Sequence, residues 1–458
     1  MNRVGGSRAK WTGKPGRVGG SGDAAISYRD ALSWLYSLQR FGIKLGLENI
    51  ERLLEELCSG VCVKRPAPAA SAPTPKVIHV AGTNGKGSVC AMIDSICRTQ
   101  GYRSGLFTSP HLVTFRERIR VNGEMISEEA VAGGLTTIRN LVANWDPHPT
   151  FFEVVTALAL KHFSDMRVEI VILETGLGGR LDATSAIQSD VSVITPIDFD
   201  HEQWLGKTIP EIATEKAGII KPGVPIVSAC QRAEAEEVIR ARAAKCGASL
   251  QLVTKPYDKA PIALAGSHQK QNAALAVAAL RAAKIDVDDS AIARGLASID
   301  WSARFQRWNE RTIVDGAHNP AAVRALAETW REIFGGQRAT LVLAVLSDKN
   351  LHAICEALVP ISESVVLPKI RSERAAAPEK LAKVLANITP SLPYSITQSV
   401  DEALAFARAK PNPILITGSL HFAGEVLAHL RGQPASFEEC AQYVGVSQRR
   451  PTKSGFRL

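Results

Sequence analysis

Short apolar runs alternate with glycine-rich turns and helix-like segments along most of this chain. The run KVIHVA at residues 76–81 is followed by a glycine-rich turn and then by the segment SVCAMIDSICRTQG at 88–101. Apolar residues in that segment recur at the spacing of one helix face, and Gly101 stands where a helix would end. The apolar positions of this face are Val89, Met92, Ile93 and Ile96. The pattern predicts a β-strand, a turn and an α-helix in succession.

The same alternation continues towards the C-terminus. Two further apolar runs are VEIVIL at 168–173 and DVSVITPI at 190–197. A second series starts past Trp301, and each of its runs precedes an amphipathic segment such as AAVRALAETWREI. The runs are RTIVDG at 311–316, ATLVLAV at 339–345, ESVVLP at 363–368, YSITQ at 394–398 and PILITG at 413–418. Because short apolar runs covered by helices are typical of parallel sheets, we expect an α/β fold.

The restart of the pattern near residue 300 predicts two domains. We expect a large nucleotide-binding domain at 28–299, with a central, mostly parallel sheet, and a smaller Rossmann-like α/β domain at 300–435. The larger one would begin with helices in ALSWLYSLQRF and LENIERLLEEL, before the Pro/Ala-rich segment KRPAPAASAPTPK. That segment cannot hold a helix and predicts a flexible connection. Residues 1–27 form a basic N-terminal extension that is expected to be disordered, and 436–458 form a basic C-terminal tail whose end, SQRRPTKSGFRL, is expected to be solvated and disordered.

Composition narrows the class of protein. Hydrophobic residues make up 45% and charged residues 22%, which is ordinary for a globular protein and excludes disorder as the main state. The net charge of +9 lies largely in the two ends and suits acidic small substrates. The eight cysteines form no CxxC pair, so we expect reduced thiols and no zinc site. With no apolar stretch of membrane-spanning length and no signal peptide, we expect a cytoplasmic protein that does not contact the membrane.

The turn after residues 76–81 has the residues of a phosphate-binding loop. Its sequence is GTNGKGS, from Gly82 to Ser88, with Val80 where the common Walker A spacing has its first glycine. Glycines let backbone N–H groups converge on an anion, the following helix directs its positive end at it, and Lys86 neutralises the outer phosphates. A nucleoside triphosphate is the ligand that this loop predicts.

Two more segments place polar side chains after apolar strands. Glu174, in LETGLGGRLDATSA, follows one strand, and a carboxylate at that edge can hold Mg²⁺ against phosphate oxygens. His201 follows the next strand and is either a metal ligand or a structural histidine. Thr208 and Glu211 form a capping box that starts a helix carrying Lys216. A buried lysine near magnesium can react with carbon dioxide to give an anionic carbamate, although the residues alone do not establish this.

Eight motifs together resemble one known family. They are HVAGTNGKGS, FTSPHLVTFRERIRVNG, TFFEVVT, LETGLGGRLDAT, DHEQWLGKTIPEIATEKAGIIK, GSHQKQNAALA, IVDGAHNPAA and LITGSLHFAGEV. In this order they resemble the folylpolyglutamate synthase and dihydrofolate synthase family, a branch of the Mur ligase superfamily, over residues 28 to 430.

The resemblance implies a role for each matching residue. Lys86, Glu174, His201 and Lys216 would be catalytic. The ATP-binding residues would be Asn84, Gly85, Lys86, Gly87, Ser88, Asn272, Arg304, Asp315 and His318. Ser109 and Glu174 would hold one Mg²⁺, and Glu174, His201 and carbamylated Lys216 a second. Contacts to the pterin substrate would come from Thr150, Phe151, Phe152 and Glu153 and from Leu181, Asp182 and Ala183. Ser302 and Ala303 stand where family members usually have Pro-Gly.

The implied activity is an ATP-dependent amide-bond ligase. It would activate the carboxylate of dihydropteroate or a folate as an acyl phosphate and join it to L-glutamate, acting as a monomer without nucleic acid. Two other interpretations stay open at this point. One is a cell-wall amino-acid ligase of the same superfamily, which would not be expected to have the TSPHL, ERIRVNG or TFFE motifs. The other is a regulatory P-loop NTPase that binds nucleic acid through its basic tails, although no nucleic-acid-reading motif is present.

Overall fold

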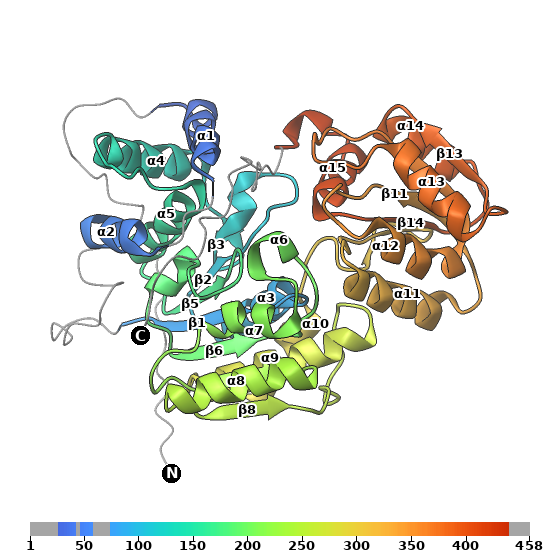
Figure 1. Ribbon diagram of the computed structural model, residues 1–458. Coiled ribbons are helices and arrows are strands. Elements are labelled where there is room, and N and C mark those ends of the chain that lie inside the picture. Colours follow the sequence, from blue (N-terminus) through green and yellow to red (C-terminus); the bar gives the residue numbers. More distant parts are fainter. Residues whose placement is uncertain (1–25, 43–45, 58–73, 439–458) are drawn as a thin grey trace, which may run out of the picture.

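Two β-sheets flanked by helices form the body of the protein (Figure 1). This is a computed structural model, and it describes residues 26–42, 46–57 and 74–438. The expectations for the N-terminal extension up to residue 25, for most of the Pro/Ala-rich segment and for the tail from 439 onward lie outside the described residues.

The first sheet has the strand order β4-β3-β2-β5-β1-β6-β7-β8. Strands from β2 to β8 along this order are parallel, whereas β3 and β4 continue the sheet as an antiparallel pair that the sequence pattern did not predict. The strands are β1 (Lys76–Ala81), β2 (Ser104–Phe107), β3 (Ile119–Val121), β4 (Glu124–Met125), β5 (Ile170–Glu174), β6 (Val191–Ile194), β7 (Ile226–Ala229) and β8 (Leu250–Val253). A mostly parallel sheet is thus confirmed.

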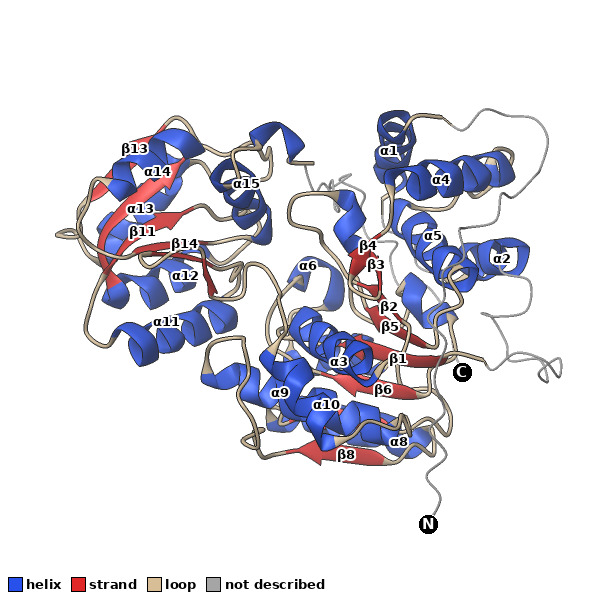
Figure 2. Ribbon diagram, turned by 180° about the vertical axis from the view of Figure 1, so that it is seen from behind, coloured by secondary structure: helices blue, strands red, loops and turns tan. Residues whose placement is uncertain are grey.

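Helices cover both faces of this sheet. Figure 2 shows α3, α9 and α10 on the face that is hidden in Figure 1, while α5, α7 and α8 pack on the other face, with α1, α2 and α4 outside α5. The bounds are α1 (Tyr28–Ser37), α2 (Glu48–Leu57), α3 (Lys86–Gln100), α4 (Glu128–Val142), α5 (Phe151–Asp165), α6 (Glu202–Leu205), α7 (Ile209–Ala217), α8 (Ala233–Lys245), α9 (Ser267–Ala282) and α10 (Asp289–Ala297).

The second sheet has the order β13-β12-β11-β14-β10-β9, in which only β9 is antiparallel. Its strands are β9 (Gln306–Arg307), β10 (Thr312–Val314), β11 (Ala339–Leu343), β12 (Ser362–Pro368), β13 (Tyr394–Thr397) and β14 (Ile414–Thr417). Its helices are α11 (Pro320–Phe334), α12 (Leu351–Leu358), α13 (Pro378–Ile388), α14 (Val400–Arg408) and α15 (Leu420–Leu430). All five runs predicted past Trp301 are strands. None of the described helices is both long and apolar enough to cross a membrane.

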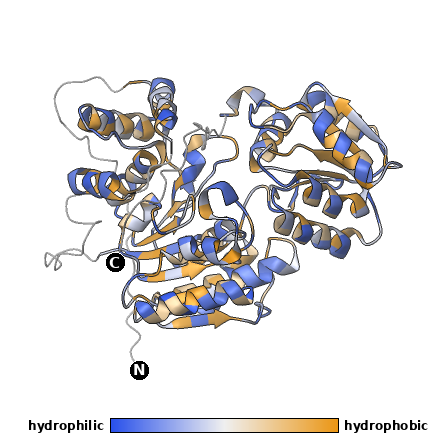
Figure 3. Ribbon diagram, viewed as in Figure 1, coloured by the Kyte–Doolittle hydropathy of each residue, from blue (hydrophilic) through white to orange (hydrophobic). Residues whose placement is uncertain are grey.

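Side-chain alternation along β1 shows why helices cover both faces. Ile78 and Val80 pack against α3 and α9, whereas Val77 and Ala81 belong to clusters on the opposite face. Successive strand residues point to opposite faces, so a run that is apolar throughout needs a helix layer on each side. Figure 3 shows the strands as mainly hydrophobic and the helices with hydrophilic outer surfaces. This core holds the carboxyl ends of the strands rigidly, and the candidate site lies there.

The buried histidine His79 on β1 is expected to make the stability of the fold sensitive to acid. Burial, followed by the charge of Lys221, lowers its pKa to about 3 from the ordinary 6.5. Between pH 6.5 and 3 the unfolded chain therefore binds a proton that the folded chain does not, so stability falls as pH falls through this window. We expect the free energy of unfolding to lose about 1.4 kcal/mol per pH unit from this group. Denaturant unfolding of His79→Gln at pH 7 and 5.5 should show a shallower pH dependence than the unsubstituted protein; equal slopes would contradict the prediction.

Candidate active site

The loop between β1 and α3 depends on two glycines. Gly82 has φ +142°, and a Cβ there would lie 1.9 Å from the Thr195 side-chain oxygen. Gly85 has φ +90°, and its Cβ would lie 2.6 Å from Oδ1 of Asn272. A side chain at either position would therefore clash, and the positive φ disfavours one in any case. Nζ of Lys86, at the start of α3, donates to the carbonyl oxygens of Gly82 and Thr83 at 3.2 Å.

A cavity of about 480 Å³ collects the residues predicted to bind ATP and metal, from both sheets. These residues are Asn84, Gly85, Lys86, Gly87, Ser88, Ser109, Glu174, His201, Lys216, Asn272, Arg304, Asp315 and His318. They come together because parallel strands end at one edge: the phosphate loop follows β1, Ser109 follows β2, and Glu174 ends β5. β1 lies between β5 and β6, beside the point where the strand order reverses.

Glu174 and Ser109 form the part of the cavity best suited to a metal ion. The Glu174 carboxylate is buried and accepts the backbone N–H of Ser109 at 3.1 Å. Burial raises the pKa of Glu174, while the charge of Lys86 opposes the rise. The Ser109 hydroxyl is buried without a hydrogen-bond partner in the structure. A buried carboxylate beside an unsatisfied hydroxyl fits a divalent cation, which takes oxygen ligands.

Lys216 lies on α7, where the sequence placed it. The predicted capping box of Thr208 and Glu211 starts this helix, with Pro210 in its first turn. Lys216 is 5% exposed, and its Nζ donates to the Gly82 carbonyl oxygen at 2.8 Å. Burial, followed by the charge of Lys86, lowers the pKa of Lys216 to about 7. A substantial fraction of this amine is therefore neutral at physiological pH.

His201 is the N-cap residue of the short helix α6 and has a left-handed backbone, φ +52°. Burial lowers the pKa of its imidazole to about 3, with the charge of Asp200 acting in the opposite direction. The ring is therefore neutral at pH 7, which is the form that binds metals. Across residues 26–42, 46–57 and 74–438, no three His, Cys, Asp or Glu side chains group as a metal site. Of the four predicted metal ligands, only Glu174 and His201 are among these residue types. Ser109 and Lys216 would therefore have to supply the remaining ligands of the two metal ions.

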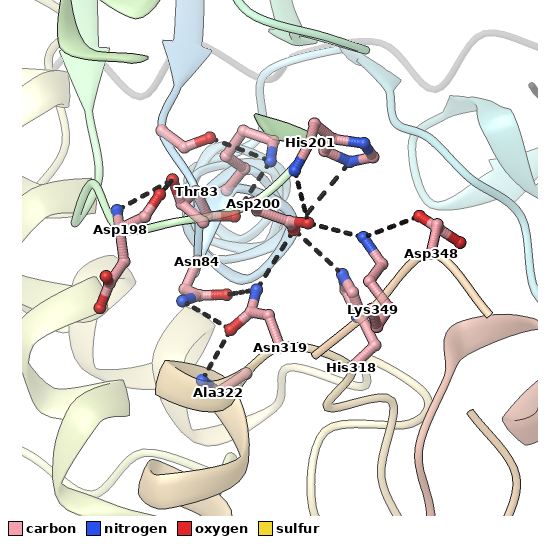
Figure 4. Close-up of polar contacts among 12 residues, drawn as sticks. Thr83, Asn84, Asp198, Asp200, His201, His318, Asn319, Ala322, Asp348 and Lys349 are labelled. Carbon is pink, nitrogen blue, oxygen red and sulfur yellow. Dashed lines mark hydrogen bonds and ion pairs between the residues drawn. The ribbon is translucent and has the colours of Figure 1, made fainter. Parts of the chain in front are cut away.

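A polar network joins the phosphate loop to the second sheet (Figure 4). Asn84 exchanges hydrogen bonds with Asn319 at the start of α11, at 2.9 and 3.3 Å. Asp200 lies 2.6 Å from Nζ of Lys349 and 3.6 Å from Nε2 of His318. Burial acts to raise the pKa of Asp200, but the hydrogen bond from His318 and the charge of Lys349 hold it well below its usual range.

Sequence reasoning did not assign Asp200, Asn319 or Lys349. Asp200 and Lys349 both follow apolar strand runs, which is the signal that identified Glu174. Their pairing was not predictable, because 149 residues separate them and they belong to different sheets.

The Asp200–Lys349 pair is expected to hold the two sheets together. Both side chains are nearly buried, at 8% and 7% exposure, and breaking a buried pair costs about 3–5 kcal/mol. Because Asp200 lies beside the first sheet and Lys349 beside the second, breaking the pair weakens the contact between the two sheets. We expect Lys349→Met to increase the radius of gyration measured by small-angle X-ray scattering. Lys380→Met, at an exposed position of α13, is the control; identical scattering from both variants would refute the prediction.

The segment between the sheets departs from the expected linker residues. Ala303, where the family usually has glycine, has φ +56° and is fully buried, and Phe305 also has a positive φ of +47°. The Asp315 carboxylate accepts the backbone N–H groups of Phe305 and Ala317, at 2.7 and 2.8 Å. Arg304 donates to the Ala303 carbonyl oxygen and reaches the cavity. Asp315 therefore fixes the backbone that carries Arg304.

The predicted pterin contacts do not line the cavity themselves. Thr150 and Glu153 form the capping box of α5 and are buried. Asp182 accepts the backbone N–H groups of Gly176 and Leu177, both at 2.9 Å. The Phe152 ring packs against Gly176, where a Cβ would be 2.4 Å from it. The predicted pterin contacts are connected to the cavity through the loop at Gly176 to Gly178, which lines it. Phe151 and Ala183 are buried, whereas Phe152 and Leu181 are partly exposed.

Comparisons with known proteins agree with this geometry. The Mur ligase middle domain matches residues 80–243, and the Mur ligase glutamate ligase domain matches residues 303–420. The chain is 35% identical over 444 residues to the dihydrofolate synthase/folylpolyglutamate synthase of Bacillus subtilis, covering 88% of this chain and 99% of the relative.

Solved structures are similar as well. E. coli FolC in complex with DHPP and ADP has a TM-score of 0.78 at 31% identity, covering 90% of this chain and 99% of that one. A bifunctional folylpolyglutamate synthase/dihydrofolate synthase with Mn, AMPPNP and L-glutamate bound has a TM-score of 0.76 at 29% identity, covering 89% and 100%.

The chain forms a first α/β unit, built on the sheet of strands β1 to β8, and a second, built on the sheet of strands β9 to β14, and the two meet around the phosphate loop. This arrangement and both domain matches define a Mur ligase, an ATP-dependent enzyme of the ligase class. Within that class the relatives are specific. The chain belongs to the dihydrofolate synthase/folylpolyglutamate synthase family.

Proposed function

We propose that this enzyme joins L-glutamate to the carboxylate of dihydropteroate, of a folate, or of both, using ATP. The observation that carries the proposal is that one cavity is lined by the phosphate loop, by Glu174 and Ser109, and by cationic residues from loops beside the second sheet. The relatives named above are dihydrofolate and folylpolyglutamate synthases, one of them solved with L-glutamate.

The reaction would have two steps. A substrate carboxylate oxygen attacks the γ-phosphorus of ATP, ADP leaves, and an acyl phosphate forms. The amino group of glutamate, once deprotonated, then attacks the acyl carbon; phosphate leaves and takes up the proton that the nitrogen loses as the amide forms. Lys86 would neutralise charge on the transferring phosphoryl group, so catalysis rests on positioning and electrostatics. The contact between the sheets would exclude water, which otherwise hydrolyses the intermediate.

Ser109 and Glu174 would hold one Mg²⁺, and Glu174, His201 and Lys216 a second. When bound, these ions would offset negative charge on the phosphates. The residues fit this role because the Ser109 hydroxyl is buried without a partner and Glu174 is a buried carboxylate.

Lys216 would act as a carbamate. The amine nitrogen attacks carbon dioxide and loses a proton, so a cation becomes an anionic oxygen ligand. The proposal rests on position: Lys216 is buried in the cavity, near Lys86 and the phosphate loop, where an unmodified ammonium would repel magnesium. The lowered pKa agrees with it, because only the neutral amine reacts.

Substrate contacts would divide between the two units. The pterin end would lie against Phe152 and Leu181, whose side chains are partly exposed, while Thr150, Phe151, Glu153, Asp182 and Ala183 shape that wall from beneath. Lys349 and Arg374, which line the cavity beyond the phosphate loop, would attract the carboxylates of glutamate. ATP contacts would come from Asn84 to Ser88, Asn272, Arg304, Asp315 and His318. We further propose that the protein acts as a monomer, since one chain supplies every residue of this site. We also propose that it acts in the cytoplasm.

Product analysis tests the proposal. Purified protein is incubated with ATP, Mg²⁺ and L-glutamate, and with dihydropteroate or tetrahydrofolate in separate reactions. ADP release should depend on glutamate, and mass spectrometry should show the acceptor enlarged by one or more glutamyl units. ADP release that does not depend on glutamate, or that nucleic acid stimulates, would refute the proposed function. Light scattering during size-exclusion chromatography tests the monomer.

A further inference from the structure

The loop that carries Ser109 leaves the first unit and enters the second. This loop, residues 108–115, follows β2, and Ser109 at its start lies beside Glu174. Farther along, Val113 is 6% exposed and packs within the apolar core between the second sheet and helices α14 and α15. At Gly424 of α15, a Cβ would lie 1.9 Å from the Leu112 carbonyl oxygen. The position of Ser109 is therefore tied to the second unit.

A segment after α15, residues 434–438, lies along this loop. We call it the C-terminal strap. Phe437 packs edge-on against His421, with ring centroids 5.0 Å apart. The Glu438 backbone N–H donates to the Val113 carbonyl oxygen at 2.8 Å. Nε2 of His111, two residues from Ser109, lies 3.1 Å from the Glu438 carbonyl oxygen. Since Nδ1 of His111 accepts from Arg118, Nε2 carries the proton and donates it to this oxygen.

The Glu438 side chain closes the arrangement. Its carboxylate accepts the backbone N–H of Phe115, the Thr114 hydroxyl at 3.2 Å and the Tyr28 hydroxyl at 3.1 Å. These donors come from η2 (Phe115–Arg118), from the residue before it, and from α1. One carboxylate from the end of the second unit thus satisfies three donors of the first. Hydrogen bonds to a charged acceptor are stronger than neutral ones, so this contact orders the loop effectively.

We propose that Glu438 is a positioning residue for the metal site: through the loop 108–115 it keeps Ser109 beside Glu174. The inference rests on the proposed function, in which Ser109 and Glu174 hold a divalent cation. Loss of the Glu438 carboxylate would free the loop and weaken metal binding without removing a ligand. Outer-shell partners of metal ligands have effects of about 10–100-fold, and an indirect partner belongs at the lower end of that range.

The test measures metal affinity directly. Mn²⁺ is titrated into full-length protein with a non-hydrolysable ATP analogue, and free Mn²⁺ is followed by electron paramagnetic resonance. We expect Glu438→Ala to weaken binding by about tenfold, Ser109→Ala by at least as much, and Glu379→Ala, at an exposed position of α13, not at all. Glu438→Gln keeps the shape of the side chain and one acceptor oxygen, so it should weaken Mn²⁺ binding by only about threefold. Hydrogen exchange in the loop should be faster in Glu438→Ala.

The variants separate the possible failures. If Ser109→Ala weakens Mn²⁺ binding and neither Glu438 variant does, the role of the strap is refuted and the metal site stands. If no variant weakens it, the proposed metal role of Ser109 fails. A purely structural role of Glu438 would reduce the fraction of folded protein and the number of sites, while leaving the affinity of each site unchanged. That outcome also overturns the inference.

Discussion

Lys216→Ala is expected to lower glutamate-dependent ADP release by at least about 100-fold while leaving ATP binding nearly unchanged. Lys216 is buried in the cavity, where its carbamate would be an anionic metal ligand, whereas Lys86 and the phosphate loop remain to bind the nucleotide. Alanine removes the ligand without adding bulk. The measurement is steady-state ADP release together with calorimetric titration of an ATP analogue.

Three controls make this result specific. Lys207→Ala changes an exposed lysine just before the same helix and should behave like the unsubstituted protein. Added formate or acetate should partly restore activity to Lys216→Ala, because a small carboxylate can occupy the space left by the carbamate. With ¹³C-bicarbonate, a carbamate resonance should appear for the unsubstituted protein and be absent from the variant. Full activity of Lys216→Ala at low bicarbonate would rule out the carbamate.

Glu174→Gln is expected to raise the Mg²⁺ concentration needed for half-maximal activity by about 10- to 100-fold. Glutamine keeps the shape of the side chain and can still accept the Ser109 N–H, but it removes a buried negative charge proposed to serve both metal ions. The maximal rate should fall as well, since excess metal cannot replace the lost charge. The measurement is ADP release as a function of Mg²⁺ at saturating ATP.

Glu124→Gln, at an exposed position of β4, is the matched control for Glu174→Gln. Both changes remove one carboxylate, so any effect of net charge alone would appear in both variants. An unchanged Mg²⁺ titration for Glu174→Gln would count against its assignment as a metal ligand.

Local patterns were sufficient for most of the fold. The strands at β1, β5 and β6 and all five strands predicted past Trp301 follow from short apolar runs next to glycines or polar turns. The missed strands are short. β2, β7 and β8 have four residues each, and β3, β4 and β9 have two or three, so too few positions alternate for a pattern to be distinguished from a turn.

Residue pattern alone predicted the site where a residue type and its place beside a strand or in a helix were informative together. Lys86 and Glu174 meet that condition, and the structure places both on one cavity. Thr150 and Glu153 show the limit: their spacing is equally that of a capping box, which is the arrangement they adopt at the start of α5. Their part in substrate binding stays a prediction.

Contacts between distant segments were not predictable. Asp200 and Lys349 are 149 residues apart, and Glu438 binds Phe115 across 323 residues. A sequence pattern reports periodicity within an element, and it contains no information on which loop ends of two separate sheets will face one another.

The amino-acid sequence by itself determined which segments form strands and helices, where the phosphate loop needs glycine, and which side chains can carry phosphoryl-transfer chemistry. These properties depend on backbone sterics and on spacing within a few residues. Only the tertiary structure decided which charges meet and how deeply each is buried. Burial and distance to other charges set the pKa of a group. The protonation states of Lys216, His201 and Asp200 therefore depend on the cavity that the two sheets form together, which the sequence does not show.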